Sequence, residues 1–214
     1  MDHPGGAERN LEHRVGGADC QRLREVTGVS QLGLLFEFAR ETLTEGGQPA
    51  VSVTSCAGVD ASSGANFEVR AARVDEVPGL LAAYEWLFAP PGSRPGLWDE
   101  RRAAVAMRQA IESHDAVVLV AVDDAGALVG ICTGYQDIHS VRFGYRAWVE
   151  DLAVDPSRRS EGIGRSLLDA AKAWAKERGA THLELDSGDA RPDAHRFYER
   201  EGPSWTSRCF GWEL

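Results

Sequence analysis

The sequence predicts an α/β (α+β) protein whose mixed sheet is flanked by helices, and three observations support this prediction. From Phe67 onward, runs of alternating or continuous apolar residues, typical of strands, lie between segments of helical periodicity. A loop with two glycines, Gly162 and Gly164, separates one strand pattern from a long helical pattern. The chain has 214 residues, of which 43% are hydrophobic and 26% charged, which suits one soluble domain with an appendage.

Residues 1–66 differ in composition from the rest, and we interpret them as a partly disordered N-terminal extension with one short helix. Apolar residues recur at helical spacing within Gln31–Thr44, and the Gly/Ser-rich stretch Val51–Asn66 is typical of a linker. A helix-turn-helix formed by Cys20–Glu25 and Gln31–Thr44 is the alternative. The segment has five basic and nine acidic residues, a net charge of −4 that suits DNA poorly.

Residues 67–214 are predicted to form one domain with the element order β-α-α-β-β-β-α-β-α-β. Its first half begins with an alternating strand, continues with a helix capped by Asp75 and a second helix after the Pro90-Pro91-Gly92 break, and ends with a hairpin that turns at Asp123–Gly126. These expected elements are Phe67–Arg73, Asp75–Leu87, Trp98–Ser113, Ala116–Val122 and Ala127–Ile138. The second half is expected to contain strand Tyr145–Val154, helix Gly162–Arg178, strand Thr181–Ser187, helix Asp193–Arg200 and strand Trp205–Leu214.

Charge and cysteine usage exclude several classes of function. The net charge of −10 disfavours nucleic acid and anionic membrane surfaces as partners. The four cysteines lie far apart, without Cys-x-x-Cys spacing or grouped histidines, so neither a metal site nor a disulfide framework is expected. No apolar run reaches the ~20 residues of a membrane-crossing helix, and the first ten residues do not resemble a secretory signal. We therefore expect a cytoplasmic protein.

The strand-loop-helix segment Trp148–Leu168 carries the chemical information. Free N–H groups at a loop that leads into a helix form a cradle for phosphate oxygens, and Gly162 and Gly164 let an anion approach the backbone. Arg159 and Arg165 add positive charge. A dinucleotide fingerprint would need a third glycine where Leu167 stands, and a nucleotide-triphosphate loop would need Gly-Lys-Ser/Thr. A glycine-rich turn that only reverses the chain remains the structural alternative.

Two motifs resemble those of the GNAT superfamily of acetyl-CoA-dependent N-acetyltransferases. Arg159-Ser-Glu-Gly162-Ile-Gly164 matches the superfamily's Arg/Gln-x-x-Gly-x-Gly/Ala loop. Asp193-Ala-His-Arg-Phe-Tyr-Glu-Arg-Glu-Gly202 is similar to its Ala-x-x-Phe-Tyr-x-x-x-Gly helix, in wording close to bacterial aminoalkylphosphonate N-acetyltransferases. The resemblance covers roughly residues 67–214. It implies the GNAT fold, a mixed and mostly antiparallel sheet of six to seven strands in which strands 4 and 5 splay apart.

The resemblance also implies a binding site for acetyl-CoA as co-substrate, without a metal. Backbone amides at the end of the strand before the loop would bind the acetyl and pantetheine groups, and the loop amides would bind the pyrophosphate. The implied binding residues are Leu152, Ala153, Val154, Arg159, Ser160, Glu161, Gly162, Ile163, Gly164 and Arg165. The family's frequent asparagine after the fifth strand is replaced around Gly188-Asp189, and Pro203 stands where the family usually has an aromatic residue.

Three residues are candidates for proton transfer. Tyr198 matches the family tyrosine that protonates the departing thiolate. A phenol suits this role, because its pKa of about 10 lies above the pKa of roughly 8.5 of a thiol. A tyrosine packed for structural reasons is the alternative. Glu150 and Asp151 are candidate bases, expected on opposite faces of their strand because a strand has a period of two. Parity with Val154 favours Glu150, and a solvated pair of carboxylates is the alternative.

The acceptor is expected to be a primary amine of a small molecule, such as an aminophosphonate, a polyamine or an amine antibiotic. Residues 67–214 have eighteen basic and twenty-four acidic residues, a net charge of −6 that favours a cationic acceptor, whereas Arg142 and Arg146 would favour an anionic one. One expected wall contains Tyr135, Asp137, His139, Ser140 and Arg142, the other Trp86, Phe88, Trp98 and Arg101, and His195 is expected to pack near the coenzyme. The alternatives are an acetyltransferase that acts on a protein or peptide and a non-catalytic module that binds acyl-CoA. The resemblance also suggests a possible homodimer.

Overall fold

The computed structural model of the chain describes residues 66–212. The expected N-terminal extension, with its helix over 31–44, lies outside these residues. Within them five strands form one sheet in the order β1-β2-β3-β4-β5. The strands are β1 (Phe67–Ala71), β2 (Ala116–Asp123), β3 (Leu128–Ser140), β4 (Gly144–Val154) and β5 (His182–Glu184). The first four are antiparallel and β5 runs parallel to β4, which confirms a mixed, mostly antiparallel sheet.

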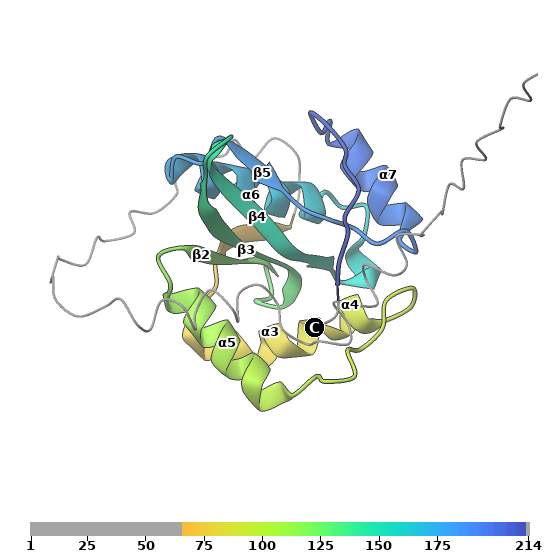
Figure 1. Cartoon of the computed structure of the whole chain (residues 1–214). Coiled ribbons are helices and arrows are strands. Elements are labelled where there is room, and N and C mark those ends of the chain that lie inside the picture. Colours follow the sequence, from red (N-terminus) through yellow and green to blue (C-terminus); the bar gives the residue numbers. More distant parts are fainter. Residues whose placement is uncertain (1–65, 213–214) are drawn as a thin grey trace, which may run out of the picture.

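Helices cover both faces of this sheet (Figure 1). They are the 3-10 turn η1 (Val74–Glu76), α3 (Val77–Ala83), α4 (Glu85–Phe88), α5 (Glu100–Glu112), the 3-10 turn η2 (Pro156–Arg158), α6 (Ile163–Glu177) and α7 (Pro192–Arg200). One face packs on α3 and α5, and the other packs on α6. None of the helices between residues 66 and 212 combines the length and apolar character that crossing a bilayer requires.

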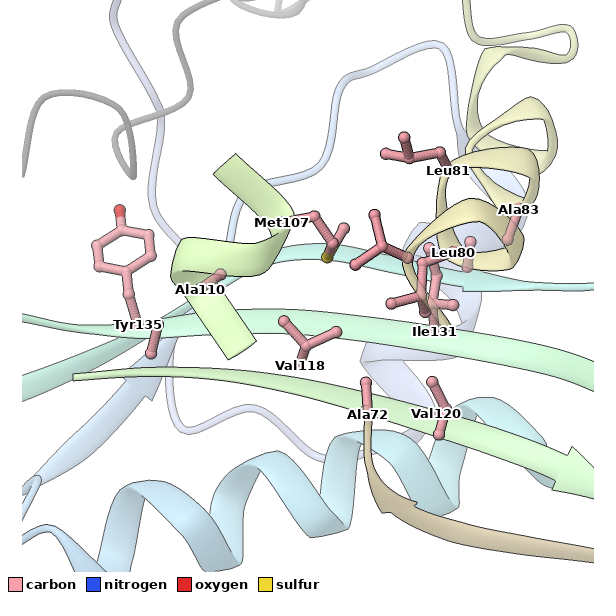
Figure 2. Close-up of a cluster of buried hydrophobic side chains, with 13 residues drawn as sticks. Ala72, Leu80, Leu81, Ala83, Met107, Ala110, Val118, Val120, Ile131 and Tyr135 are labelled. Carbon is pink, nitrogen blue, oxygen red and sulfur yellow. The ribbon is translucent and has the colours of Figure 1, made fainter. Parts of the chain in front are cut away.

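Two apolar cores result, one on each face of the sheet. On the first face Leu80 of α3 and Ile131 of β3 are fully buried, together with Met107 of α5 (Figure 2). On the second face the apolar side of α6 buries Ile163 and Leu167 against the sheet. Burial of each such side chain is worth ~1.5–3 kcal/mol. The apolar residues that recur at strand and helix spacing in the sequence are therefore the ones that form these two cores.

Three expected elements differ from the structure. The helix expected over Asp75–Leu87 is split, because η1 precedes it and the chain bends at Tyr84 between α3 and α4. The strand expected over Thr181–Ser187 is only three residues long. The last strand, expected over 205–214, does not form within the described residues, where 203–212 carry no strand. Its apolar residues have strand propensity, yet a strand also needs a partner, and Phe210 is 69% exposed.

Candidate active site

Strands β4 and β5 stay together for only a short distance. Their pairing runs from Arg146 with His182 to Trp148 with Glu184, whereas β4 continues to Val154. The last residues of β4 thus pair with β3 on one side and diverge from β5 on the other. This divergence matches the splay implied by the resemblance.

Backbone groups at the end of β4 point into this gap. The N–H group of Asp155 donates to the carbonyl oxygen of Val129 at 3.0 Å, on the β3 side. Because alternate residues of a strand direct their N–H groups to the same side, those of Leu152 and Val154 point away from β3. The end of β4 therefore has N–H groups that face the gap between the two strands.

The loop that follows β4 presents a run of available N–H groups. Ser160 and Gly162 have positive φ values of 68° and 87°, and α6 begins at Ile163. Within the described part of the chain, no N–H group from Arg159 to Arg165 donates a hydrogen bond, while that of Ser166 already donates to the carbonyl oxygen of Gly162. Together with the positive end of the helix dipole, these groups fit a diphosphate.

Ion pairs hold the loop from both sides. Arg158, which sequence reasoning did not single out, pairs with Glu161 at 2.8 Å and with Asp123 at 3.3 Å. Arg165 pairs with Glu201, at the end of α7, at 3.0 Å. The carboxylate of Glu161 is thus turned to Arg158, and the charge of Arg165 is partly neutralised. Arg159, the other arginine that the sequence singles out at this loop, is exposed.

The two sequence motifs meet at Gly164. A Cβ atom there would lie 3.5 Å from the Phe197 ring of α7 and 3.7 Å from Cγ2 of Val154. These are ordinary van der Waals contacts, so a Cβ atom would fit at Gly164, whereas Gly162 faces open space and is favoured by its positive φ. The Phe-Tyr helix α7 therefore packs directly on the phosphate loop.

Tyr198 lies on α7 with its hydroxyl buried. Burial raises the pKa of Tyr198 well above its usual value, and the charges of Asp151 and Asp186 raise it further, while Arg191 lowers it. The nearby Cys132 thiol also raises it, and burial raises the pKa of that thiol to about 12. At neutral pH the Tyr198 hydroxyl thus retains its proton. The structure brings it within electrostatic reach of Asp151 on β4.

The expectation that Glu150 and Asp151 face opposite sides of β4 is wrong. Thr133 of β3 pairs with Asp151, but the next residue, Gly134, pairs with Val149, so Glu150 is an extra residue that forms a β-bulge. A bulge interrupts the period of two on which the expectation rested. The negative charges of both carboxylates act on the hydroxyl of Tyr84, so both lie near the α3 and α4 side of the sheet.

Tyr84 and Thr133 are site residues that sequence reasoning missed. The Tyr84 hydroxyl donates to Oδ2 of Asp151 at 2.7 Å, and Oγ1 of Thr133 donates to the same oxygen at 3.2 Å. The ring of Tyr84 contacts Phe88 and Trp98, with ring centroids 6.0 Å and 5.6 Å away. One signal was available: a tyrosine on an apolar helix face needs a partner for its hydroxyl.

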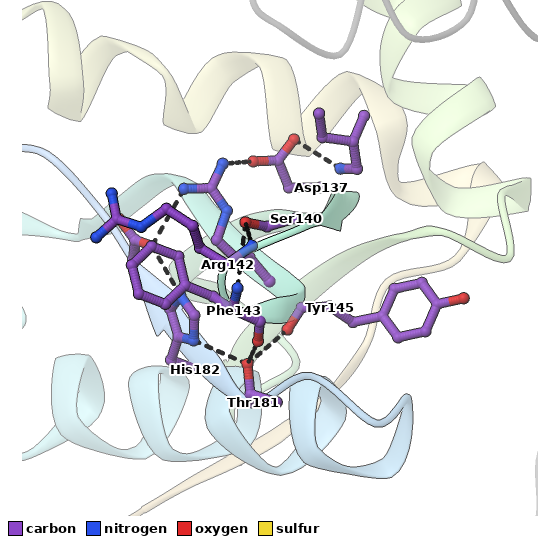
Figure 3. Close-up of polar contacts among 10 residues, drawn as sticks. Asp137, Ser140, Arg142, Phe143, Tyr145, Thr181 and His182 are labelled. Carbon is purple, nitrogen blue, oxygen red and sulfur yellow. Dashed lines mark hydrogen bonds and ion pairs between the residues drawn. The ribbon is translucent and has the colours of Figure 1, made fainter.

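The expected wall around the β3–β4 hairpin is largely occupied by its own contacts (Figure 3). Arg146 binds the carboxylates of Asp137 and Glu184, so this arginine does not favour an anionic acceptor. Arg142 lies over the Phe143 ring. His139 and Tyr145 stack at 4.3 Å, and Nε2 of His195 lies 3.2 Å from the carbonyl oxygen of Ser187.

Comparison with known proteins decides the family. Residues 80–202, more than half of the chain, match the acetyltransferase (GNAT) family. The chain belongs to this family. The match includes the splayed strand, the phosphate loop and the Phe-Tyr helix of this GNAT domain.

Curated relatives match over shorter segments. The uncharacterized N-acetyltransferase YhdJ of Bacillus subtilis is 34% identical over 90 residues, which cover 42% of this chain and 63% of that protein. The aminoalkylphosphonate N-acetyltransferase of Salmonella typhimurium is 36% identical over 77 residues, 36% of this chain and 50% of its own length. The matched segments thus span less than two thirds of either relative.

Solved structures share the fold. The aminoglycoside antibiotic 6'-N-acetyltransferase AAC(6')-Ih of Acinetobacter baumannii superposes with a TM-score of 0.59 at 19% identity, over 69% of this chain and 97% of that one. At this identity the likeness concerns the fold alone. It confirms that the layers and the order of elements described above are those of a GNAT acetyltransferase.

Proposed function

We propose that this GNAT domain moves an acetyl group from acetyl-CoA to a primary amine of a small molecule, by direct attack in a ternary complex. The observation that carries the proposal is the run of available N–H groups from Arg159 to Arg165, at the foot of the gap between β4 and β5. A diphosphate held on these groups would direct the attached pantetheine arm along the N–H groups of Leu152 and Val154.

The proposed reaction needs two proton transfers. The amine nitrogen attacks the thioester carbonyl carbon, a C–N bond forms, and the C–S bond then breaks to release the thiolate. The attacking nitrogen must lose a proton to a base, and the thiolate must gain one from an acid. The backbone N–H groups at the end of β4 would stabilise the negative charge on the carbonyl oxygen.

Tyr198 is the proposed acid. Its raised pKa means that the hydroxyl is protonated at every pH at which the enzyme would work, so a proton is always available for the thiolate. Phe197, its neighbour on α7, packs at Gly164 and thereby places Tyr198 relative to the phosphate loop. The proposed acid and the proposed coenzyme site are thus joined by a packing contact.

Glu150 is the proposed base, directly or through a water molecule. It is the extra residue of the bulge, located just beyond the last β4–β5 pair at Trp148. Asp151 already accepts two hydroxyl hydrogen bonds on one oxygen, which assigns it a supporting role. The base and the acid therefore come from different elements, β4 and α7, that meet at the splay.

A cationic amine is the proposed acceptor class. The net charge of the domain is negative, and both Asp137 and Glu184 already bind Arg146. Asp151 accepts a hydrogen bond from Tyr84, whose ring contacts Phe88 and Trp98, so a carboxylate and aromatic rings lie near one another, a combination that suits an ammonium group. The names of similar proteins, an aminoalkylphosphonate N-acetyltransferase and an aminoglycoside acetyltransferase, also indicate small amines. A cytoplasmic location and a homodimer remain proposals from the sequence.

An amine panel tests the proposed function. The full chain is incubated with acetyl-CoA and polyamines, aminoglycosides, aminoalkylphosphonates or peptides, and free coenzyme A thiol is measured over time. Turnover with small amines, fastest with cationic ones, is the expected result. Calorimetry with coenzyme A is the matched measurement. Binding without turnover would indicate a regulatory module, turnover with peptides alone a protein acetyltransferase, and absence of binding would overturn the proposal.

A further inference from the structure

The hydroxyl of Tyr84 connects the two sides of the acceptor region. Tyr84 lies at the bend where α3 ends and α4 begins, 67 residues before its hydrogen-bond partner Asp151 in β4. The short α4 helix lies beside the end of β4 (Figure 1). One hydrogen bond of 2.7 Å therefore joins the helical wall over the sheet to the strand that carries the proposed base.

The geometry of this contact is well defined. Oδ2 of Asp151 accepts from both Tyr84 and Thr133, and Thr133 is the β3 residue that pairs with Asp151 just before the register shifts. Two donors on one oxygen fix the rotation of a carboxylate. Asp151, which adjoins the bulge, is thus held by Tyr84 of the helix layer and by Thr133 of the neighbouring strand.

We propose that Tyr84 is a positioning residue for acyl transfer: its hydroxyl holds Asp151 and thereby fixes the bulge that presents Glu150 to the acceptor amine. The proposal rests on the proposed function, because it assigns Tyr84 a role in that same site. In this scheme the Tyr84 hydroxyl touches neither substrate nor coenzyme. It acts through Asp151.

A second contact links α4 to the segment before α7. Nη2 of Arg191, the residue that precedes α7, donates to the carbonyl oxygen of Leu87 in α4 at 2.9 Å. A Cβ atom at Gly92 would lie 2.0 Å from that same carbonyl oxygen. The α4 helix is therefore tied to β4 through Tyr84 and to the helix of the proposed acid through Arg191, so the acceptor wall has a fixed place relative to both proton-transfer groups.

The groups that would respond to loss of the Tyr84 hydroxyl come from several elements. The charges of Asp151 and Glu150 raise the pKa of Tyr84. The charge of Asp151 also raises the pKa of Cys132 in β3 and of Tyr198 in α7. The pKa of Tyr198 is further raised by Asp186 and lowered by Arg191. Burial raises the pKa of Tyr84 well above its usual value, so its hydroxyl donates at all working pH values. Without this donor Asp151 holds a proton more readily, because hydrogen bonds to a charged form favour that form. The acidic limb of the pH profile reports the two neighbouring carboxylates of the bulge as a pair, so we expect it to move to higher pH.

The test is Tyr84→Phe, which removes one oxygen and keeps the ring that packs on Phe88 and Trp98. The pH dependence of kcat/KM for the best amine of the panel is measured for the wild type and the variant. We expect a value about tenfold lower at pH 7 and an acidic limb about one pH unit higher. The Kd for coenzyme A is expected to stay within about twofold, because the phosphate loop is untouched.

Three further variants control for structural damage. Tyr145→Phe removes a phenol hydroxyl on the β3–β4 hairpin, where the ring is 44% exposed, and is expected to leave the pH profile unmoved. Thr133→Val removes the second donor and is expected to shift the limb in the same direction as Tyr84→Phe, whereas Thr133→Ser keeps a hydroxyl and is expected to restore it.

The outcomes separate the two proposals. If the wild type shows no turnover with any amine, the proposed function fails. If the wild type turns over and Tyr84→Phe lowers only the melting temperature, with an unmoved acidic limb, Tyr84 is structural and the positioning role is overturned. A shifted limb together with an unchanged Kd for coenzyme A supports it.

Discussion

The phosphate loop and the bulge of β4 are two functional regions only a few residues apart, and they are built differently. The loop at 159–165 is made of backbone groups whose geometry follows from Gly162 and from the start of α6. The bulge at Glu150 is fixed by residues far away in sequence, Gly134 and Thr133 of β3 and Tyr84 of the helix layer. Local sequence encodes the first region, and tertiary contacts encode the second.

This difference teaches where sequence motifs are informative. A cradle for phosphate is a local structure, so its residues occur together and form a motif. A pair of proton-transfer groups is an arrangement of separate elements, and the proposed pair, Glu150 on β4 and Tyr198 on α7, has no fixed spacing in sequence. Variants in the two regions should therefore change different quantities, coenzyme affinity for the loop and turnover or its pH dependence for the proton-transfer side.

Tyr198→Phe is expected to have the largest effect, on turnover alone. Loss of a general acid lowers kcat by about 100-fold or more, while coenzyme A affinity stays the same because α7 still packs at Gly164. Stopped-flow thiol release and calorimetry measure the two quantities. The pKa of Tyr198 is raised above the ordinary value of about 10, so its hydroxyl keeps the proton up to at least that pH. The wild type should therefore retain its activity on the alkaline side up to about pH 10. An equal loss of affinity and turnover would contradict this separation.

Glu150→Gln is expected to reduce kcat/KM by roughly 30-fold at pH 7, because the amine then lacks its base. The deficit should shrink as pH rises, since solution supplies more of the neutral amine. The acidic limb of the wild-type profile should disappear in the variant. Asp151→Asn is the matched control on the neighbouring residue: if it abolishes the limb and Glu150→Gln leaves it, the roles assigned to the two carboxylates are reversed.

Much of the fold could be predicted from the sequence, since α6, β2, β3 and β4 begin and end within two residues of the expected positions. Their patterns are long and strongly periodic, and the turn at Asp123–Gly126 has the expected residues. The expected strand at 205–214 failed because propensity does not supply a partner, and β5 pairs with β4 over three residues only. Residues 203–212 instead lie exposed, and Trp205 contacts His182.

The candidate site was only half predictable for the same reason. The cradle residues Arg159, Gly162 and Gly164 follow from their order in the chain. The bulge does not, because the register shift depends on how β4 pairs with β3. The break of the first helix at Tyr84 has no proline or glycine at that residue to mark it, so the bend could not be anticipated. That the Tyr84 hydroxyl needs a partner could be, but not that this partner is Asp151.

Gly134→Ala is expected to damage the bulge through the backbone. A Cβ atom at Gly134 would lie 2.8 Å from the carbonyl oxygen of Trp148, and this oxygen cannot move aside as a side chain could. Overpacking of this kind costs about 1–3 kcal/mol of unfolding free energy, measurable by urea denaturation. Gly79→Ala in α3 is the control, with nothing within 4 Å of the new atom and an expected gain of about 0.5–1 kcal/mol. Equal stability of Gly134→Ala and wild type would show that β3 does not determine the bulge.

Ser160→Gly and Gly162→Ala form a matched pair with the smallest expected effects. Both positions have positive φ, and left-handed backbone costs a residue with a Cβ about 1–2 kcal/mol. Alanine lowers the conformational entropy of the unfolded chain, which offsets part of this strain, so Gly162→Ala should lose about 1 kcal/mol of stability. Its coenzyme A binding should also be weaker. Ser160→Gly relieves the same strain, but glycine loses more entropy on folding, so a net gain of at most about 0.5 kcal/mol is expected. If coenzyme A affinity instead falls tenfold in Ser160→Gly, the serine hydroxyl contributes to binding, and the loop is not a cradle of backbone groups alone.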